Sequence, residues 1–358
     1  MNKNSFTDNP FFLLQVSPRD SEKRLLDRAA EMKLLFGTDT QPALNTLLHP
    51  SERLEAEIGY LPGTGQSVQN AVRESLLYGS VPDPDAEPEL PLALLNYVNA
   101  RLGDWSFHTP ENAAAAVLAL ARIADSVSPD QEEAAINADR LAGGWVLSDI
   151  GEEGKSKIRA HLREIGILIG ERCEESLPLW DIQNLRTRLS VCYSAKEGVC
   201  YRSPFLNNMV MFYLSNRIRQ TIEEKKETIS VIIREFEEDE ENHGFFKVQK
   251  TYAATSEYQN RRKALRQEKT EELLCAIREW DVLTAPELMI MRTKGIFRED
   301  ADSLFRITHR FFCDLVNKYS DWDDAGNLIR QIWESFPDIS EANRDLVQKQ
   351  VEAFANRR

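Results

Sequence analysis

The segment Gly151-Glu-Glu-Gly-Lys155-Ser156 contains the residue types of a phosphate-binding loop, in which glycines wrap a phosphate, a lysine neutralises it and a serine helps to hold a metal ion. That pattern requires a further glycine five positions before the second one, where this chain has Asp149. The two intervening glutamates would also repel phosphate oxygens. We therefore interpret the segment as the start of a helix, with both glutamates near the positive end of the helix dipole.

The cysteines and histidines are scattered along the chain without the spacing of a zinc site, and no Gly-x-Ser-x-Gly nucleophile motif is present. We predict no catalytic residue, no metal site and no cofactor, and hence a protein that is not an enzyme. The odd number of cysteines favours reduced thiols in a cytoplasm over a disulfide framework, although Cys192 and Cys200 are near enough in sequence for a thiol pair. The residues concerned are Cys173, Cys192, Cys200, Cys275 and Cys313, and His49, His108, His161, His243 and His309.

One dense basic cluster lies in the second half of the chain, with Tyr252 and Tyr258 nearby for base stacking. We call it the basic stripe; it consists of Arg261, Arg262, Lys263, Arg266 and Lys269. Nucleic acid could bind such a helix face. A charge seam between two helices is the favoured interpretation, because acidic residues 235–241 are expected on the facing helix.

The composition describes a globular chain of 358 residues, of which 42% are hydrophobic. With 58 acidic and 44 basic residues, the net charge of −14 repels phosphate backbones and anionic lipids. Residues 1–9 lack an apolar signal core, and the longest apolar runs, such as 209–214, are too short to cross a bilayer. We expect a cytoplasmic protein with no membrane association.

Helical periodicity dominates the pattern of apolar residues, so we predict an all-α fold. In residues 21–36, Leu25, Ala29, Met32 and Phe36 form one apolar stripe, with Ser17-Pro18 predicted as the helix start and Gly37 as its end. Shorter helices are predicted at 42–48 and 51–60, the latter with Leu54, Ile58 and Leu61 in its buried stripe and Pro62-Gly63 at its end.

Further helices are predicted at 68–78, 112–126, 130–141 and 152–175, with a proline-rich acidic linker at 82–88. Residues 205–280 form two long amphipathic stretches around His243-Gly244 and predict an extended helical hairpin with a charged tip. Two more apolar stripes, from Leu304 to Tyr319 and from Ala325 to Phe336, predict a helical pair that a third helix at 341–355 covers. The predicted domains are 1–66, 67–204 (a central helical bundle), 205–280 and 281–358.

The N-terminal region resembles the J domain of the DnaJ co-chaperones over about residues 9–62. The matching features are the opening Asn9-Pro-Phe-Phe-Leu-Leu-Gln-Val-Ser17, the long second helix, and the closing Leu47-Leu-His-Pro-Ser-Glu-Arg-Leu-Glu-Ala-Glu-Ile-Gly-Tyr60. The resemblance implies a helical domain that docks on a DnaK-type ATPase.

In that family a His-Pro-Asp tripeptide follows the second helix and engages the ATPase. Gly37, Thr38 and Asp39 occupy its place here, so only the aspartate matches. The resemblance therefore implies docking without strong stimulation of ATP hydrolysis. The partner-binding residues that it implies are Lys23, Arg24, Arg28, Lys33 and Asp39, while a solvated helix of mixed charge is an equally open interpretation of the basic residues.

The C-terminal pair resembles a single tetratricopeptide hairpin. The segment Asp321-Trp-Asp-Asp-Ala325 is similar to the inter-helix turn and small alanine of that family, and Phe336-Pro337 to its repeat end. One copy is compatible with peptide binding or with packing alone, and packing is the favoured interpretation.

These observations together predict a J-like co-chaperone or adaptor that binds a protein partner, such as a DnaK-like ATPase. The alternatives are a structural subunit of a bacterial multiprotein assembly, for instance in defence, and, with less support, a nucleic-acid-associated factor.

Overall fold

The computed structural model describes residues 6–79, 87–102, 107–145, 149–194, 202–243, 256–294, 299–337 and 339–356. Within these ranges every regular element is helical and none is a strand, which confirms the predicted all-α class. Cys200, Gly244 and residues 82–86 of the predicted linker lie outside them.

The chain forms two compact units. Unit 1 comprises Met1–Leu185 and Ala195–Met209, and unit 2 comprises Arg186–Ser194 and Val210–Arg358. The four domains predicted from the sequence make a finer division, which stays a prediction.

Unit 1 begins with a short helical turn, η1 (Phe6–Asp8), and four helices. These are α1 (Pro10–Leu14), α2 (Glu22–Phe36), α3 (Gln41–Leu48) and α4 (Pro50–Ile58). The start of α2 differs from the sequence prediction, because its N-cap is Ser21, whose Oγ accepts from the Arg24 amide at 3.4 Å. Ser17 instead opens a turn, in which its amide donates to Asp20 Oδ2 at 2.7 Å.

An aromatic cluster fixes the core of these first helices. The Tyr60 ring stacks on Phe11 and Phe6, at centroid distances of 5.6 and 5.3 Å, and Phe11 and Tyr60 are fully buried. Leu25 of α2 and Leu47 of α3 complete the buried apolar contacts. Large buried side chains of this kind supply most of the stability of so small a helical group.

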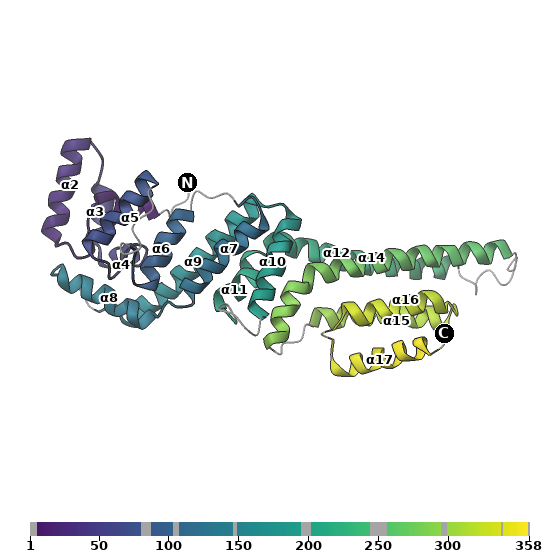
Figure 1. Cartoon of the computed structure of the whole chain (residues 1–358). Coiled ribbons are helices and arrows are strands. Elements are labelled where there is room, and N and C mark those ends of the chain that lie inside the picture. Colours follow the sequence, from purple (N-terminus) through teal and green to yellow (C-terminus); the bar gives the residue numbers. More distant parts are fainter. Residues whose placement is uncertain are drawn as a thin grey trace. The chain divides into compact units, whose positions relative to one another are not determined.

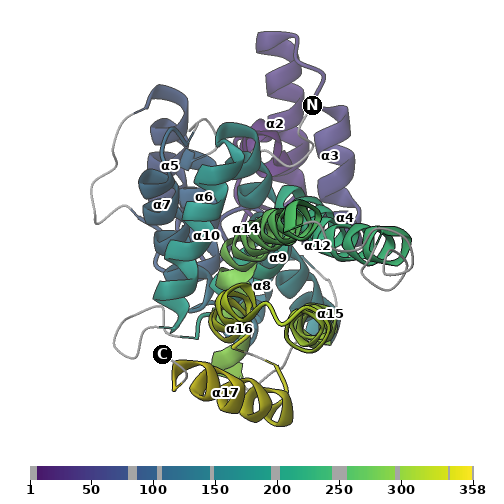
Figure 2. The same ribbon diagram turned by 90° about the vertical axis from the view of Figure 1, so that its right-hand side faces the viewer.

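The other helices of unit 1 pack around this group. They are α5 (Gln66–Tyr78), α6 (Pro91–Leu102), α7 (Pro110–Ala124), α8 (Pro129–Ala142), α9 (Gly151–Ser176), the first part of α10 (Leu179–Ser194) and α11 (Pro204–Asn208). Among these helices, α4 packs on α9, α6 on α7, and α8 on α9. Figure 1 shows α2 at the edge of unit 1, with its C-terminal end extending beyond the neighbouring helices, and Figure 2 shows the same end from the side.

Unit 2 contains a π-helical turn, η3 (Met209–Tyr213), whose first residue belongs to unit 1, and the helices α12 (Asn216–His243) and α14 (Ser256–Lys294). These two long helices lie side by side in Figures 1 and 2, as the predicted hairpin requires. The second arm continues past Trp280, where the prediction ended, and Pro286 lies inside the helix. The hairpin is therefore longer than its sequence pattern indicated.

Three shorter helices complete unit 2: α15 (Glu299–Asn317), α16 (Trp322–Ser335) and α17 (Glu341–Ala355). The predicted stripes are buried at Leu304, Phe311, Ala325 and Ile329. As expected, α17 packs on this pair: it packs on α16, and its Phe354 ring contacts Phe312 of α15. Helix α16 also packs on α14. The likeness of this helical pair to a tetratricopeptide hairpin stays a prediction.

In the part of the chain described here, no helix combines the length and the apolar character needed to span a bilayer.

Candidate functional site

The C-terminal end of α2 exposes three consecutive large apolar side chains. The exposed fractions are 85% for Leu34, 61% for Leu35 and 66% for Phe36. Their helical spacing places these side chains around the helix rather than along one stripe. A cluster of exposed apolar side chains on a protruding element is a feature of protein-binding surfaces. We call these three residues the α2 tip.

Phe36 was predicted to belong to the buried stripe of this helix, and that prediction is wrong. Leu25, Ala29 and Met32 are buried as expected, but the last turn of α2 extends beyond the helices that cover them. The period of the sequence therefore identified the correct face of the helix, while the length of the covering helices decided where burial stops.

The loop after α2 holds the residues that occupy the place of the J-domain tripeptide. Gly37 ends the helix with a φ of +65°, a left-handed conformation that glycine adopts without strain. Thr38 and Asp39 are exposed, and Asp39 Oδ1 accepts from the Gln41 amide at 3.2 Å. The next residue anchors the loop, because the buried Thr40 hydroxyl donates to the Ala29 carbonyl at 3.1 Å.

The four basic residues of α2 do not form a single face. A rotation of about 100° per residue places Arg24 and Lys33 on opposite sides of the helix. Lys23, Arg24 and Lys33 are exposed. Arg28 already makes two contacts within the protein: its Nε donates to the Leu14 carbonyl at 3.3 Å, and its Nη1 pairs with Glu31 at 2.8 Å. Arg28 is therefore a structural contact of α2 with the end of α1 as well as a candidate docking residue.

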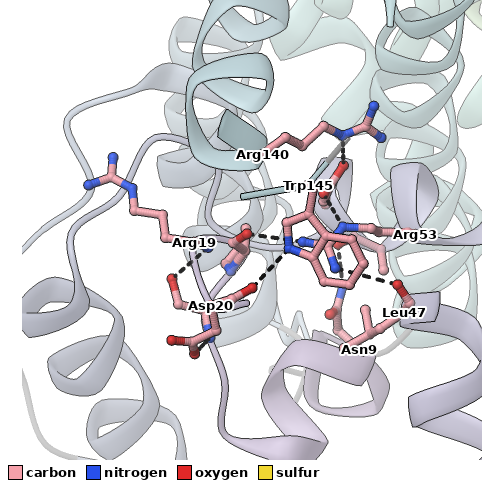
Figure 3. Close-up of polar contacts among 11 residues, drawn as sticks. Asn9, Arg19, Asp20, Leu47, Arg53, Arg140 and Trp145 are labelled. Atoms are coloured by element: carbon pink, nitrogen blue, oxygen red, sulfur yellow. Dashed lines mark hydrogen bonds and ion pairs between the residues drawn. The ribbon is translucent and has the colours of Figure 1, made fainter. Parts of the chain in front are cut away.

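A buried cation anchors the base of this region. The Arg53 side chain of α4 is 1% exposed, and its guanidinium lies 3.8 Å from the centroid of the Trp145 ring (Figure 3). Its Nε donates to Glu57 at 2.7 Å, and its other nitrogens donate to the carbonyls of Leu47 at 3.4 Å and Pro18 at 3.0 Å. Arg53 thus joins α3, α4 and the segment that leads into α2.

Further hydrogen bonds connect the Arg53 side chain and its partners to α8 and the loop after it. The second Glu57 oxygen accepts from Arg140 Nε at 2.8 Å, and the Trp145 indole donates to the Asp20 carbonyl at 2.9 Å. Asp139, which is 2% exposed, accepts from Arg19 Nε at 2.6 Å and from the Gly63 amide at 2.7 Å. Each buried charge of this network has an oppositely charged partner, which offsets the cost of removing it from water. The hydrogen bonds to the carbonyls of Pro18 and Asp20 attach the turn that leads into α2 to this network.

The phosphate-loop candidate forms a helix start, as the sequence predicted. Helix α9 begins at Gly151, with Glu152 and Glu153 in its first turn. Lys155 Nζ pairs with Asp130 at 2.6 Å, with Glu133 at 3.2 Å and with Glu152 at 3.2 Å, and these carboxylates raise its pKa. The lysine that would neutralise a phosphate is therefore already surrounded by anions.

Three of the five residues of the basic stripe contact acidic side chains of α12 or of the start of α16, while Arg261 and Lys263 are exposed. Arg262 pairs with Asp239, and Lys269 Nζ lies 3.4 Å from Glu235. Arg266 lies over the Tyr319 ring, 5.0 Å from its centroid, and 3.9 Å from Asp321. The contacts of Arg262 and Lys269 are those of an interhelical charge seam.

The thiols and imidazoles are spread over both units. Cys173 is buried, and burial raises its pKa to about 12, so the thiol stays protonated. Cys313 Sγ lies 3.8 Å from His309 Nδ1. Among the described residues, no group of three or more histidine, cysteine or acidic side chains could hold a metal ion.

Comparisons of this chain with protein-family models, curated proteins and solved structures gave no match.

The sequence pattern did not lead us to predict the α2 tip or the buried contacts of Arg53. Three apolar residues in a row exceed what one helical stripe can bury, and that excess was the available signal for the tip. Arg53 and Glu57 are four residues apart and resemble an ordinary surface pair. Their burial depends on Trp145 and Arg140, which the fold brings from distant positions.

Proposed function

We propose that this protein is an adaptor that docks on a protein partner through the α2 tip and the following loop, and that the partner is a DnaK-like chaperone ATPase. The observation that carries the proposal is the exposure of Leu34, Leu35 and Phe36 beside Gly37-Thr38-Asp39. This is the position at which the J-domain resemblance predicts contact with an ATPase.

The chemistry of the loop favours binding without strong stimulation of the ATPase. Thr38 and Gly37 replace the proline that would fix the backbone and the histidine that would supply a ring donor. Asp39 keeps a carboxylate that can accept a charge-assisted hydrogen bond from a partner arginine. The apolar tip adds contact area that does not depend on the tripeptide.

The nucleic-acid alternative has little support from the side-chain contacts. The two stripe residues Arg262 and Lys269 already pair with carboxylates of α12, and nucleic acid would have to compete with those pairs. The acidic charge of the chain opposes the same interaction.

The test measures binding of the full chain to a DnaK-like ATPase from the same cells. The double variant Leu34→Ser with Leu35→Ser should weaken binding at least ~10-fold, because each leucine would lose on the order of 1 to 2 kcal/mol of apolar burial. The matched control is Leu141→Ser near the end of α8, where the leucine is 80% exposed. This control variant should bind the ATPase with the same affinity as the unaltered chain.

Single-turnover ATP hydrolysis by the partner distinguishes an adaptor from a working co-chaperone. We expect little stimulation by the unaltered chain and no further change with Asp39→Ala. Large stimulation that disappears in Asp39→Ala would replace the adaptor function with that of an active co-chaperone. Absence of any binding to such ATPases would contradict the proposed partner and favour the structural-subunit alternative.

A further inference from the structure

A polar cavity of about 540 Å³ lies in unit 1, between the start of α1, helix α4, helix α6 and helix α9. Cavities of ~300 to 1,000 Å³ are typical of sites that enclose small molecules or single side chains. No residue of the α2 tip lines this cavity, so it is separate from the proposed docking surface.

The hydrogen bonds of Asn96 determine which nitrogen of His161 carries the proton. Asn96 Nδ2 donates to the carbonyls of Ile58 and Tyr60, both at 2.8 Å, so both amide hydrogens are used. Its Oδ1 lies 2.8 Å from His161 Nε2 and must accept from it. Burial lowers the pKa of His161 to about 4, so the ring is neutral at pH 7 and Nδ1 keeps its lone pair.

Asn99 lines the same cavity and carries a second acceptor. The Asn99 Oδ1 atom is buried and has no hydrogen-bond partner among the described residues. Leaving such an oxygen without a donor costs free energy, which a bound donor would recover. The residues that line the cavity therefore include two neutral acceptors for which the described part of the chain supplies no donor.

Acidic side chains also line this cavity. Glu52 and Glu164 line it with exposed side-chain fractions of 56% and 57%, and Glu164 Oε2 lies 4.0 Å from His161 Nδ1. The lysine of the lining, Lys157, pairs with Glu55 at 2.9 Å. The residues that line the cavity therefore carry more negative than positive charge.

We propose that this cavity binds a primary ammonium or guanidinium group, which donates to His161 Nδ1 and Asn99 Oδ1 while its charge lies near Glu164 and Glu52. A group of this kind supplies several donors and a positive charge at once, whereas a carboxylate or phosphate would meet only acceptors and anions. The cation comes either from a small amine or from a lysine or arginine side chain of a partner.

The experiment titrates the full chain with butylammonium, butylguanidinium and the peptide acetyl-Gly-Lys-Gly-amide, with acetyl-Gly-Gly-Gly-amide as the uncharged probe. Nitrogen NMR of the His161 ring reports the bond, because a donor to Nδ1 shifts that resonance. The signal is assigned with His161→Gln. Tighter binding of the small cations indicates a free amine as the ligand, and tighter binding of the lysine peptide indicates a partner side chain.

Two substitutions test the geometry, with a control on the same helix. Glu164→Gln should weaken binding of the cations about 10-fold, the effect of losing one charge-assisted contact, and Asn99→Asp should tighten it by adding an anion. The exposed Glu171 of α9 does not line the cavity, and Glu171→Gln should leave binding unchanged. Thermal unfolding checks that each variant is folded.

The proposal is overturned if the cations do not bind saturably or leave the His161 resonance in place. It is also overturned if Glu171→Gln weakens binding as much as Glu164→Gln does, because attraction to the acidic surface in general would then explain the result.

Discussion

The guanidinium of Arg53 lies over the ring of Trp145 at 3.8 Å and also pairs with Glu57 at 2.7 Å, so one buried cation joins an aromatic ring and a carboxylate. A cation that is stacked and paired at once keeps its charge satisfied away from water. Arg53 also holds the turn from Ser17 to Asp20, because its guanidinium donates a hydrogen bond to the Pro18 carbonyl. The orientation of α2 therefore depends on Arg53.

Replacing Arg53 tests this dependence. Arg53→Ala should lower the free energy of unfolding by about 3 to 5 kcal/mol, because it leaves Glu57 buried with one cation instead of two. Urea unfolding followed by circular dichroism measures the change. Arg24→Ala, at an exposed position of α2, is the matched control and should change stability by less than about 0.5 kcal/mol. A loss at Arg53 as small as at Arg24 would mean that the network does not hold this region together.

The two arginines on the first turns of α2 should respond differently to charge reversal. Arg28→Glu should destabilise the chain by about 1 to 2 kcal/mol, because it removes the bond to the Leu14 carbonyl and places a second carboxylate beside Glu31. Arg24→Glu should leave the melting temperature nearly unchanged. Differential scanning calorimetry of both variants gives the comparison. Equal melting temperatures would show that the Arg28 contacts with α1 contribute little.

Glu132 should make the folded state less stable as the pH rises. It is fully buried, its Oε1 accepts from the Leu92 amide at 3.0 Å, and burial raises its pKa to about 7 from 4.5. Between these values the folded protein keeps a proton that the unfolded chain has released, so stability falls as pH rises, by up to about 3 kcal/mol. Glu132→Gln removes this titration.

The measurement is urea unfolding of both chains at pH 4.5, 6 and 8. As the pH rises, the free energy of unfolding of Glu132→Gln should increase relative to that of the unaltered chain. A difference that stays constant with pH would show that Glu132 titrates alike in the folded and unfolded states.

His161 should have the opposite effect on stability. Because burial lowers its pKa to about 4 from 6.5, the unfolded chain takes up a proton in this interval that the folded protein does not. Stability therefore falls as the pH drops from 6.5 to 4, by about 1 to 3 kcal/mol, with Glu164 at 4.0 Å reducing the effect. His161→Gln should become relatively more stable as the pH decreases in the same urea series. The two effects oppose each other in the unaltered chain, so only the single variants reveal them.

The helical period of the sequence predicted the class of the fold and the approximate positions of many helices. The predicted stripe of α2 is buried at Leu25, Ala29 and Met32, and the predicted third C-terminal helix matches α17 in its bounds. These features are local, because the spacing of apolar residues along one helix already states which face must leave water.

The tertiary structure decided which of these faces is covered and which polar residues are buried. Phe36 continues the apolar stripe of α2 but is exposed, since none of the helices described here covers it. Helix α14 continues through Pro286. Arg53 has the sequence context of a surface residue and becomes one of the most buried side chains. Spacing along a chain cannot show the partners that a fold brings from distant segments, and Trp145 and Arg140 reach Arg53 and Glu57 in that way.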